Sequence, residues 1–352
     1  MTTPLPAITI AGRRIAADAP PYVIAELSAN HNGSLDTALA IVDAAQAAGA
    51  DAVKLQTYRP DTITLDSDGE GFVIEGGLWH GRRLYDLYQE AHMPWDWHAA
   101  LFARARQRGI TLFSSPFDTT AVDLLEDLGA PAYKIASFEA VDLPLIRYVA
   151  RTGKPMIIST GMADAEEIDE AVQAARDGGC TQLALLHCVS GYPAPAADYK
   201  LRTLSDMITR WGVVTGLSDH TLDNTTAIAA VALGAALIEK HFTLDRAGGG
   251  PDDSFSLMPA ELAQLCQGAK TAWSALGQVD YGRKSSEIGN AQFRRSLYFV
   301  KPLRAGDTIT ADAVRSVRPG FGLAPKYWDA VVGKRAARDI AVNTPVAWDA
   351  LA

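Results

Sequence analysis

The sequence has little cysteine, and it lacks both long apolar runs and clusters of basic residues. Its 352 residues include three cysteines, Cys180, Cys188 and Cys266. Because their number is odd and their spacing does not suit a zinc site, we expect buried thiols in a reducing compartment. No apolar run is long enough to span a membrane, and the stretch MTTPLPAITI has neither the basic nor the apolar region of a signal peptide. We therefore expect a cytoplasmic protein that is neither exported nor membrane-bound.

The charge of the chain argues against a nucleic-acid-binding protein. The formal net charge is −9, and no Lys/Arg cluster of the kind that follows a phosphate backbone occurs. No GxGxxG or P-loop motif follows the first predicted strand, which disfavours a nucleotide-binding sheet. With 48% hydrophobic and 21% charged residues, the composition is that of a globular protein with a large core. An anionic ligand would have to be bound by local donors.

Short apolar runs alternate with helical stretches through most of the chain. The strand-like runs are YVIAELS, AVKLQTY, TLFSSPF, AYKIAS, MIISTG, LALLHCVS, VVTGLSDH and LIEKHF. Eight strands, each followed by a helix over about 250 residues, predict a (β/α)₈ TIM barrel of class α/β. We assign residues 21–278 to this barrel. Residues 1–20, which contain two short alternating runs about a glycine, predict a β-hairpin cap ahead of it.

The residue composition of the sequence changes after the predicted barrel. Residues 279–292 are polar and contain Gly and Ser, as in a linker, whereas residues 293–352 hold short β-rich pieces and many turns. This tail predicts a small β-rich domain of its own. Its basic residues contrast with the acidic whole, and they form either a solvated basic face or a source of one arginine for a ligand in the barrel. They include Arg294, Arg295, Arg315 and Arg318.

Two histidines mark the ends of the last two predicted strands. His220 follows VVTGLSD, His241 ends LIEKH, and a helical run separates them. Because such a crossover makes neighbouring strands parallel, both imidazoles should emerge at one rim, within reach of a single divalent metal ion. The alternative is two unrelated histidines, one buried and hydrogen-bonded and one at the surface.

Lysines and small hydroxyl residues recur at the predicted strand ends, where a barrel carries its chemistry. Lys54 and Lys134 lie within apolar strands, so each needs an anionic partner: a carboxylate such as Glu26 or Glu139, or a ligand. Fixed hydroxyl donors beside positive charge suit a phosphate or carboxylate. A Schiff-base aldolase is the other use of a barrel lysine, but two lysines with several hydroxyls fit an anion site better. Each serine alone is equally a turn or cap residue.

Ordered blocks along nearly the whole chain resemble the sialic acid synthase family. The blocks are ELSANHNGSL, KLQTY, SSPFD, YKIASFE, STGM, CVSGYPAP, GLSDHT, IEKHFT, RRSLY and RPGFGL. Two stretches, ELSANHNGS and LWHGRRLYDLYQEAHMPWDWH, are most similar to the pseudaminic acid synthases within that family. The resemblance implies an enzyme that joins phosphoenolpyruvate to an acetamido sugar, with a divalent metal, and releases phosphate. It also implies a tail similar to type III antifreeze protein (an SAF domain) in a domain-swapped homodimer.

The resemblance also implies roles for individual residues. His220 and His241 match the metal ligands, with Mn²⁺ the expected ion and Mg²⁺ and Co²⁺ as alternatives, and Glu26 matches the catalytic acid/base. The positions around phosphoenolpyruvate are matched by Lys54, Lys134, Ser137, Ser159, Ser190 and Ser218. The positions near the sugar are matched by Glu139, Tyr192, Asp252 and, from the partner's tail, Arg318. Val189 and Met258 depart from the residues usual in the family.

The subfamily resemblance implies a specific sugar, 2,4-diacetamido-2,4,6-trideoxy-L-altrose. An aromatic-rich insertion after the second strand, with Trp79, Tyr85, Tyr88 and Trp95, would suit its methyl and acetyl groups, although these rings could equally anchor a long loop. The alternatives are an N-acetylneuraminate or legionaminic acid synthase and, more remotely, a non-catalytic carbohydrate-binding protein. The five residues Glu26, Lys54, Lys134, His220 and His241 argue against the last, since a binding module does not need them all.

Overall fold

The computed structural model describes residues 5–352, which fall into two compact units that meet between Gly277 and Gln278. Residues 1–4 of the predicted cap lie outside the described residues. Each unit has its own hydrophobic core, and the two are described separately. Within residues 5–352, no helix combines the length and the apolarity needed to cross a bilayer.

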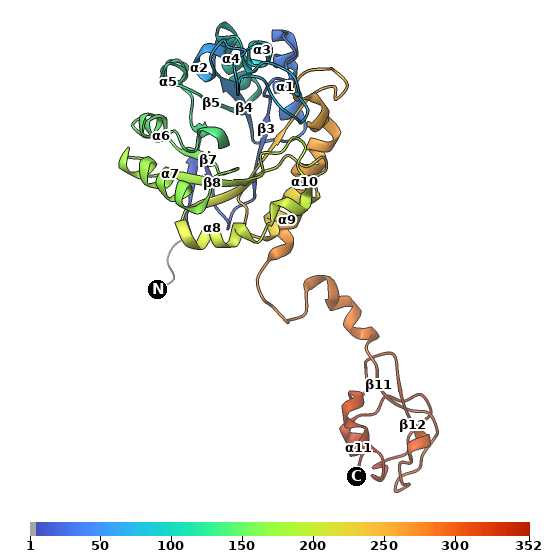
Figure 1. Ribbon diagram of the computed structural model, residues 1–352. Coiled ribbons are helices and arrows are strands. Elements are labelled where there is room, and N and C mark those ends of the chain that lie inside the picture. The colour runs from blue at the N-terminus through green and yellow to red at the C-terminus, as the bar shows by residue number, and fades with distance from the viewer. Residues whose placement is uncertain (1–4) are drawn as a thin grey trace. The chain divides into compact units, whose positions relative to one another are not determined.

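The first unit is a closed parallel barrel (Figure 1), as the sequence predicts. Its neighbours around the ring are β10-β3-β4-β5-β6-β7-β8-β9. Closure comes from pairing of β10 with β3, which sets His241 opposite Glu26 in the register. The strands are β3 (Tyr22–Glu26), β4 (Ala52–Thr57), β5 (Thr111–Pro116), β6 (Tyr133–Ile135), β7 (Met156–Ser159), β8 (Leu183–Cys188), β9 (Val214–Ser218) and β10 (Leu237–His241).

Helices follow the strands and cover the barrel from outside (Figure 1). Their apolar faces make a core with the outward-facing strand residues, as α8 shows by burying Leu204, Met207 and Trp211 at helical spacing. Local signals start several of them: the Asp164 side chain and Glu167 form a capping box at α7. The helices are α1 (Leu35–Ala47), α4 (His98–Arg108), α5 (Thr119–Asp127), α6 (Leu143–Ala150), α7 (Ala165–Asp177), α8 (Thr203–Trp211), α9 (Thr225–Ala232) and α10 (Pro259–Leu276).

A hairpin closes the amino-terminal end of the barrel. Strands β1 (Ile8–Ile10) and β2 (Arg13–Ile15) pair antiparallel, and their isoleucines join an apolar cluster with the early residues of the barrel strands, such as Tyr22, Phe113 and Leu237. Because side chains alternate along a strand, the next inward position toward the carboxyl end lies two residues further on. The apolar plug therefore leaves the carboxyl-terminal half of the interior to polar residues.

The long insertion between β4 and α4 has only short elements. It contains α2 (Pro60–Ile63), α3 (Leu84–Ala91), the 3₁₀ turn η1 (Trp95–Trp97) and an isolated bridge between Val73 and Arg83. Other 3₁₀ turns in this unit are η2 (Ser137–Glu139), η3 (Ala196–Tyr199) and η4 (Asp253–Phe255).

The second unit is small and rich in turns, as the sequence predicts. Strands β11 (Ser296–Phe299) and β12 (Val314–Val317) pair antiparallel around a core that includes Leu297, Val331 and Val346. Its short helices are η5 (Ser285–Phe293), which lies partly in the predicted linker, η6 (Ala311–Ala313), η7 (Pro325–Tyr327), α11 (Trp328–Val331) and η8 (Trp348–Ala350).

Candidate active site

Buried charged and hydroxyl side chains line the carboxyl-terminal half of the barrel interior. On β10, for example, Leu237 belongs to the apolar plug, and Glu239 and His241 follow at two-residue spacing. The same alternation leads from Tyr22 through Ile24 to Glu26 on β3. The fully buried polar residues of this layer are Glu26, Lys54, Ser115, Lys134, Ser159, Ser218 and Glu239.

Lys54 lies between two carboxylates. Its Nζ is 2.8 Å from Glu26 Oε2 and 3.7 Å from Glu239 Oε1, and it donates to Ser115 Oγ over 3.2 Å. Burial opposes the charged form of Lys54, but the two carboxylates outweigh it and raise its pKa. Burial also raises the pKa of Glu26, and Lys54 only partly offsets this. Glu26 therefore lies in a buried pair with Lys54, in which Glu26 can either keep a proton or exchange it.

Lys134 has a weaker partner. Its closest carboxylate oxygen is Glu239 Oε1 at 3.6 Å, which is beyond ordinary hydrogen-bond distance. Burial, reinforced by the charge of Lys54, lowers the pKa of Lys134. The sequence prediction that Glu26 could pair with a lysine is confirmed, since Glu26 pairs with Lys54. The prediction of Glu139 as a lysine partner is wrong, because the second carboxylate near both lysines is Glu239. The sequence signal for Glu239 is its two-residue spacing from His241, which puts both side chains on the inner face of β10. Closure of the barrel then brings Glu239 near the lysines.

Glu139 is a half-buried residue without a strong counterion. It ends η2, its Oε2 is buried without a hydrogen-bond partner, and burial raises its pKa to about 7. The charges of Lys134 and Lys54 oppose this shift without cancelling it. Burial raises the pKa of Tyr88 in the insertion, and the charge of Glu139 adds to that rise.

Two of the predicted serines, Ser137 and Ser190, lie beside Gly161. Ser137 Oγ accepts a hydrogen bond from Gly161 N over 3.1 Å, and any side chain at Gly161 would collide with the hydroxyls of Ser190 and Ser137. The hydroxyls of Ser159 and Ser190 are buried without a partner. Since buried hydroxyls are normally paired, these two are available to a bound ligand. Ser218 differs, because it donates to Glu239 Oε1 over 3.3 Å.

His220 and His241 lie side by side, as predicted from the sequence. Their ring centroids are 5.5 Å apart. His220 Nδ1 is 2.8 Å from the Val189 backbone carbonyl, so the family departure at Val189 leaves this bond intact. Burial lowers the pKa of His241, and the neighbouring His220 adds to this. Burial also disfavours charge on His220, but Cys188, whose Sγ is 4.0 Å from Nδ1, raises its pKa.

Within residues 5–352, no group of three or more His, Cys, Asp or Glu residues could hold a metal ion, so a metal at the two histidines would have only two protein ligands. His241 Nδ1 is buried without a hydrogen-bond partner, and Asp252 Oδ2 lies 3.8 Å from it. Because Nδ1 of His220 is hydrogen-bonded to a carbonyl, Nε2 is the nitrogen of that ring that remains to bind a metal ion. The residues therefore fit an ion with two protein ligands and several positions open to water or substrate.

A hydrogen-bonded chain that we did not anticipate from the sequence joins Glu26 to Asp252. Gln56 Nε2 donates to Glu26 Oε1 and to Ser28 Oγ, both over 2.9 Å, and Ser28 Oγ donates to Asp252. Ser28 adopts a φ of 47°, an uncommon conformation for a residue other than glycine. These hydrogen bonds connect Glu26, the predicted acid/base, to Asp252, a predicted sugar-binding residue.

Of the other predicted sugar-binding residues, Tyr192 belongs to the barrel unit and Arg318 to the second unit. The Tyr192 ring lies tilted against His220 with a centroid distance of 4.3 Å, at the mouth of the barrel. Arg318 belongs to the second unit, just after β12, where its side chain is exposed. Met258, the second family departure, precedes α10, and its sulfur accepts from Arg246 N over 3.3 Å.

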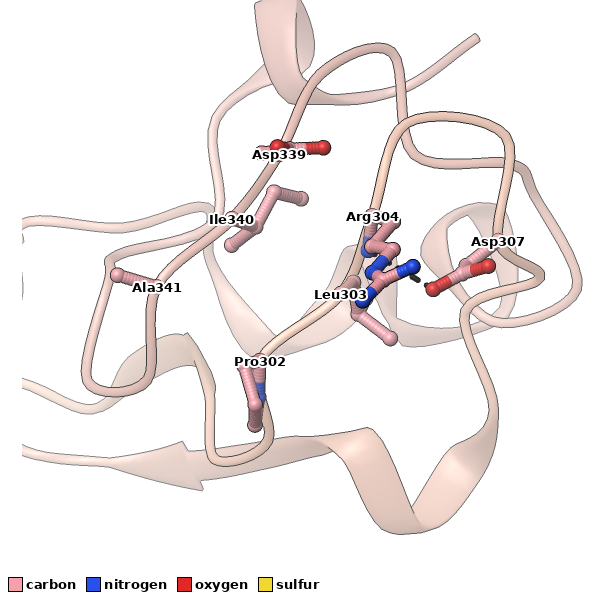
Figure 2. A pocket seen from close by; sticks show the side chains of 7 residues that line it. All are labelled: Pro302, Leu303, Arg304, Asp307, Asp339, Ile340 and Ala341. Atoms are coloured by element: carbon pink, nitrogen blue, oxygen red, sulfur yellow. Dashed lines mark hydrogen bonds between the residues drawn. The ribbon is translucent and has the colours of Figure 1, made fainter.

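A pocket in the second unit is not a candidate site. It has a volume of about 540 Å³ and is lined by residues of two loops (Figure 2). Its carboxylates are already satisfied, because Asp307 accepts from Arg304 N and Asp339 accepts from Ala305 N, each over 2.8 Å. None of the predicted site residues lines it.

Comparisons with known proteins find relatives that match both units of the chain. The NeuB family profile matches residues 41–281, and the SAF domain profile matches residues 294–352. The chain is 43% identical to the pseudaminic acid synthase of Campylobacter jejuni (strain 81-176), over 91% of this chain and 93% of that one. It is 41% identical to the pseudaminic acid synthase of Helicobacter pylori, over 94% and 97%. Identity to the N,N'-diacetyllegionaminic acid synthase of Legionella pneumophila is 33%, over 93% and 94%.

A solved structure shares the fold. The N-acetylneuraminic acid synthetase of Leptospira borgpetersenii, in complex with citrate, superposes with a TM-score of 0.72 at 31% identity. The match covers 81% of this chain and 94% of that one.

Proposed function

The chain belongs to the NeuB family, and we propose that it is a pseudaminic acid synthase. It condenses phosphoenolpyruvate with 2,4-diacetamido-2,4,6-trideoxy-L-altrose and water to give pseudaminic acid and phosphate. The observation that carries the choice of sugar is the higher identity to pseudaminic acid synthases, 41–43% against 33% for legionaminic acid synthases, over more than nine tenths of the chain. An N-acetylneuraminate or legionaminic acid synthase is the alternative.

The two buried lysines and the unpaired hydroxyls form the phosphoenolpyruvate site in this proposal. Lys134 has no carboxylate within hydrogen-bond distance, and the hydroxyls of Ser159 and Ser190 lack partners, so all three can take an anionic ligand without breaking a strong bond. Positive charge and fixed donors in a buried site bind carboxylate and phosphate strongly. Ser137 and Ser218 complete the set from neighbouring strand ends.

His220 and His241 would hold the divalent ion, for which we propose Mn²⁺. Bound there, such an ion supplies Lewis-acid polarisation of the sugar's aldehyde oxygen. Its two imidazole ligands would come from adjacent strand ends, with Asp252 nearby.

Glu26 moves the proton in this mechanism. The enol carbon of phosphoenolpyruvate forms the new bond to the aldehyde carbon while the π electrons of the aldehyde move to its oxygen, which takes up a proton. Water adds at C2, where positive charge develops. Glu26 accepts the proton of that water or stabilises the charge, while Lys54 and Gln56 hold its two oxygens. The C2–O bond to phosphate then breaks, phosphate leaves with the bonding pair, and the C2 hydroxyl gives up its proton to the departing phosphate as the keto group forms. The anionic substrate further raises the pKa of Glu26, because it adds negative charge to a buried site.

We further propose a domain-swapped homodimer in the cytoplasm, in which Arg318 contacts the sugar in the partner's barrel. The exposed side chain of Arg318 and the separate core of the second unit support this arrangement. The three cysteines, all buried and unpaired, are consistent with a reducing compartment.

Phosphate release from phosphoenolpyruvate tests the proposed function. The assay contains Mn²⁺ and compares 2,4-diacetamido-2,4,6-trideoxy-L-altrose with N-acetylmannosamine, with and without a chelator. We expect turnover of the trideoxy sugar that the chelator abolishes and that added Mn²⁺ restores. Turnover of N-acetylmannosamine alone would overturn the sugar assignment, and turnover unaffected by the chelator would remove the metal.

A further inference from the structure

The insertion after β4 reaches across the mouth of the barrel. In the closed order, β4 and β8 are four strands apart and therefore lie on opposite sides. Yet the Trp79 ring of the insertion lies 5.7 Å, centroid to centroid, from Tyr192, which follows β8. Trp79 Nε1 also donates to the backbone carbonyl of Pro251, beyond β10, over 3.1 Å. The insertion thus spans the opening above the buried charges.

Trp79 is the outer member of a set of rings around the two histidines. The Tyr192 ring packs at a tilt against His220, with centroids 4.3 Å apart, and lies 5.3 Å from Phe255, which in turn lies 5.0 Å from His241. A ligand that approaches the histidines from the open end must pass this set.

Trp95, in the same insertion, has a different setting. Its Nε1 donates to the backbone carbonyl of Tyr58 over 3.2 Å, and the Arg59 guanidinium covers its ring at 4.5 Å. Trp79 and Trp95 are both half-buried and both donate to a backbone carbonyl, but the ring of Trp79 contacts Tyr192. The pair offers a matched comparison.

We propose that Trp79 is a specificity-determining residue that packs against the apolar face of the sugar; this inference rests on the proposed function. Because its N–H is already bound to Pro251, the indole presents apolar surface rather than a donor toward the ring set. Such a surface favours a sugar that carries a deoxy methyl and two acetamido methyls over one with a hydroxylated tail. The discrimination between these two kinds of sugar comes from the contact area of a few methyl groups.

Three variants of the full chain test the proposal by steady-state phosphate release: Trp79→Ala, Trp79→Phe and the control Trp95→Ala. We expect Trp79→Ala to raise KM for the trideoxy sugar about tenfold or more, with KM for phosphoenolpyruvate changed less than about twofold. Trp79→Phe retains a ring and should keep most of the affinity for the sugar. Trp95→Ala should change neither KM, and thermal melting of each variant checks its folding.

Two results would overturn the inference while the proposed function stands: an equal rise in sugar KM in Trp95→Ala, or an unchanged sugar KM in Trp79→Ala. Equal loss in Trp79→Phe and Trp79→Ala would also overturn it, because the indole N–H bond to Pro251 would then carry the effect rather than ring packing. Absence of turnover of any sugar by the unaltered protein would overturn the proposed function and this inference with it.

Discussion

At the scale of single residues, the barrel holds two ammonium groups and two carboxylates in one buried layer. Lys54 and Glu26 form the close pair, whereas Lys134 shares Glu239 only at longer range. Breaking a close buried pair is costly, since the remaining charge is left in a poor solvent for ions. This asymmetry suits Lys134 for binding an incoming anion and leaves Glu26 in place for proton transfer.

Replacing Glu26 by Gln tests the proton-transfer role. The amide keeps the size of the side chain and Lys54 keeps Glu239 nearby, so phosphoenolpyruvate binding should survive. Turnover should fall about 10²-fold to 10⁴-fold, the usual contribution of a positioned acid/base. Phosphate release measures turnover, and calorimetric titration measures phosphoenolpyruvate binding. Undiminished turnover would remove Glu26 from the mechanism.

Glu139 makes stability depend on pH. Its pKa is raised from 4.5 to about 7 in the folded chain, so between these values the unfolded chain has lost a proton that the folded chain retains. The Glu139 contribution therefore destabilises the fold as pH rises through this window, by about 3 kcal/mol in total. Glu139→Gln removes the effect, so its stability relative to the unaltered protein should increase from pH 4.5 to 7. Urea unfolding at both values measures this, and parallel curves would contradict it.

At the scale of elements, an ion pair on the outer side of the sheet connects β10 to the segment after β9. Lys240 Nζ is 2.9 Å from Asp219 Oδ2 and donates to the backbone carbonyls of Thr221 and Asp223 over 2.7 and 2.8 Å. Lys240 precedes His241 and Asp219 precedes His220, so the buried pair fixes the backbone that carries both histidines.

Lys240→Met should therefore destabilise the protein strongly. It leaves Asp219 buried without a counterion, which costs about 3–5 kcal/mol. The matched control is Lys154→Met, which removes an ion pair with Glu126 that is only partly buried and should cost no more than about 1 kcal/mol. Chemical denaturation gives both free energies of unfolding, and equal losses in the two variants would refute the structural role of the Lys240 pair.

At the scale of the whole molecule, the predicted site residues are divided between two units with separate cores. The barrel carries the charged layer, the serines and the histidines, whereas Arg318 lies in the second unit. In the proposed homodimer, each active site needs the barrel of one copy and the arginine of the other.

Co-expression of two inactive variants tests this exchange. Arg318→Ala should lose sugar affinity, and Glu26→Gln should lose turnover. In a mixed dimer, the barrel with intact Glu26 receives Arg318 from the other copy, so activity should return to about one quarter of the unaltered value if the copies mix at random. Gel filtration verifies the dimer. A mixture as inactive as its components would place Arg318 in its own chain's site, and an Arg318→Ala variant that keeps its activity would place Arg318 outside the site.

The sequence alone determined the barrel, the strand-end position of the site and its donor types, because alternation along a strand and the rhythm of strand and helix are local properties. His220 and His241 could be placed together for the same reason, since a single crossover separates them. Only the tertiary structure decided that Glu239 rather than Glu139 accompanies the lysines and that Trp79 crosses to Tyr192. Those contacts join residues about 100 or more positions apart, and they depend on which side chains of distant strands and loops meet across the barrel, which no local pattern specifies.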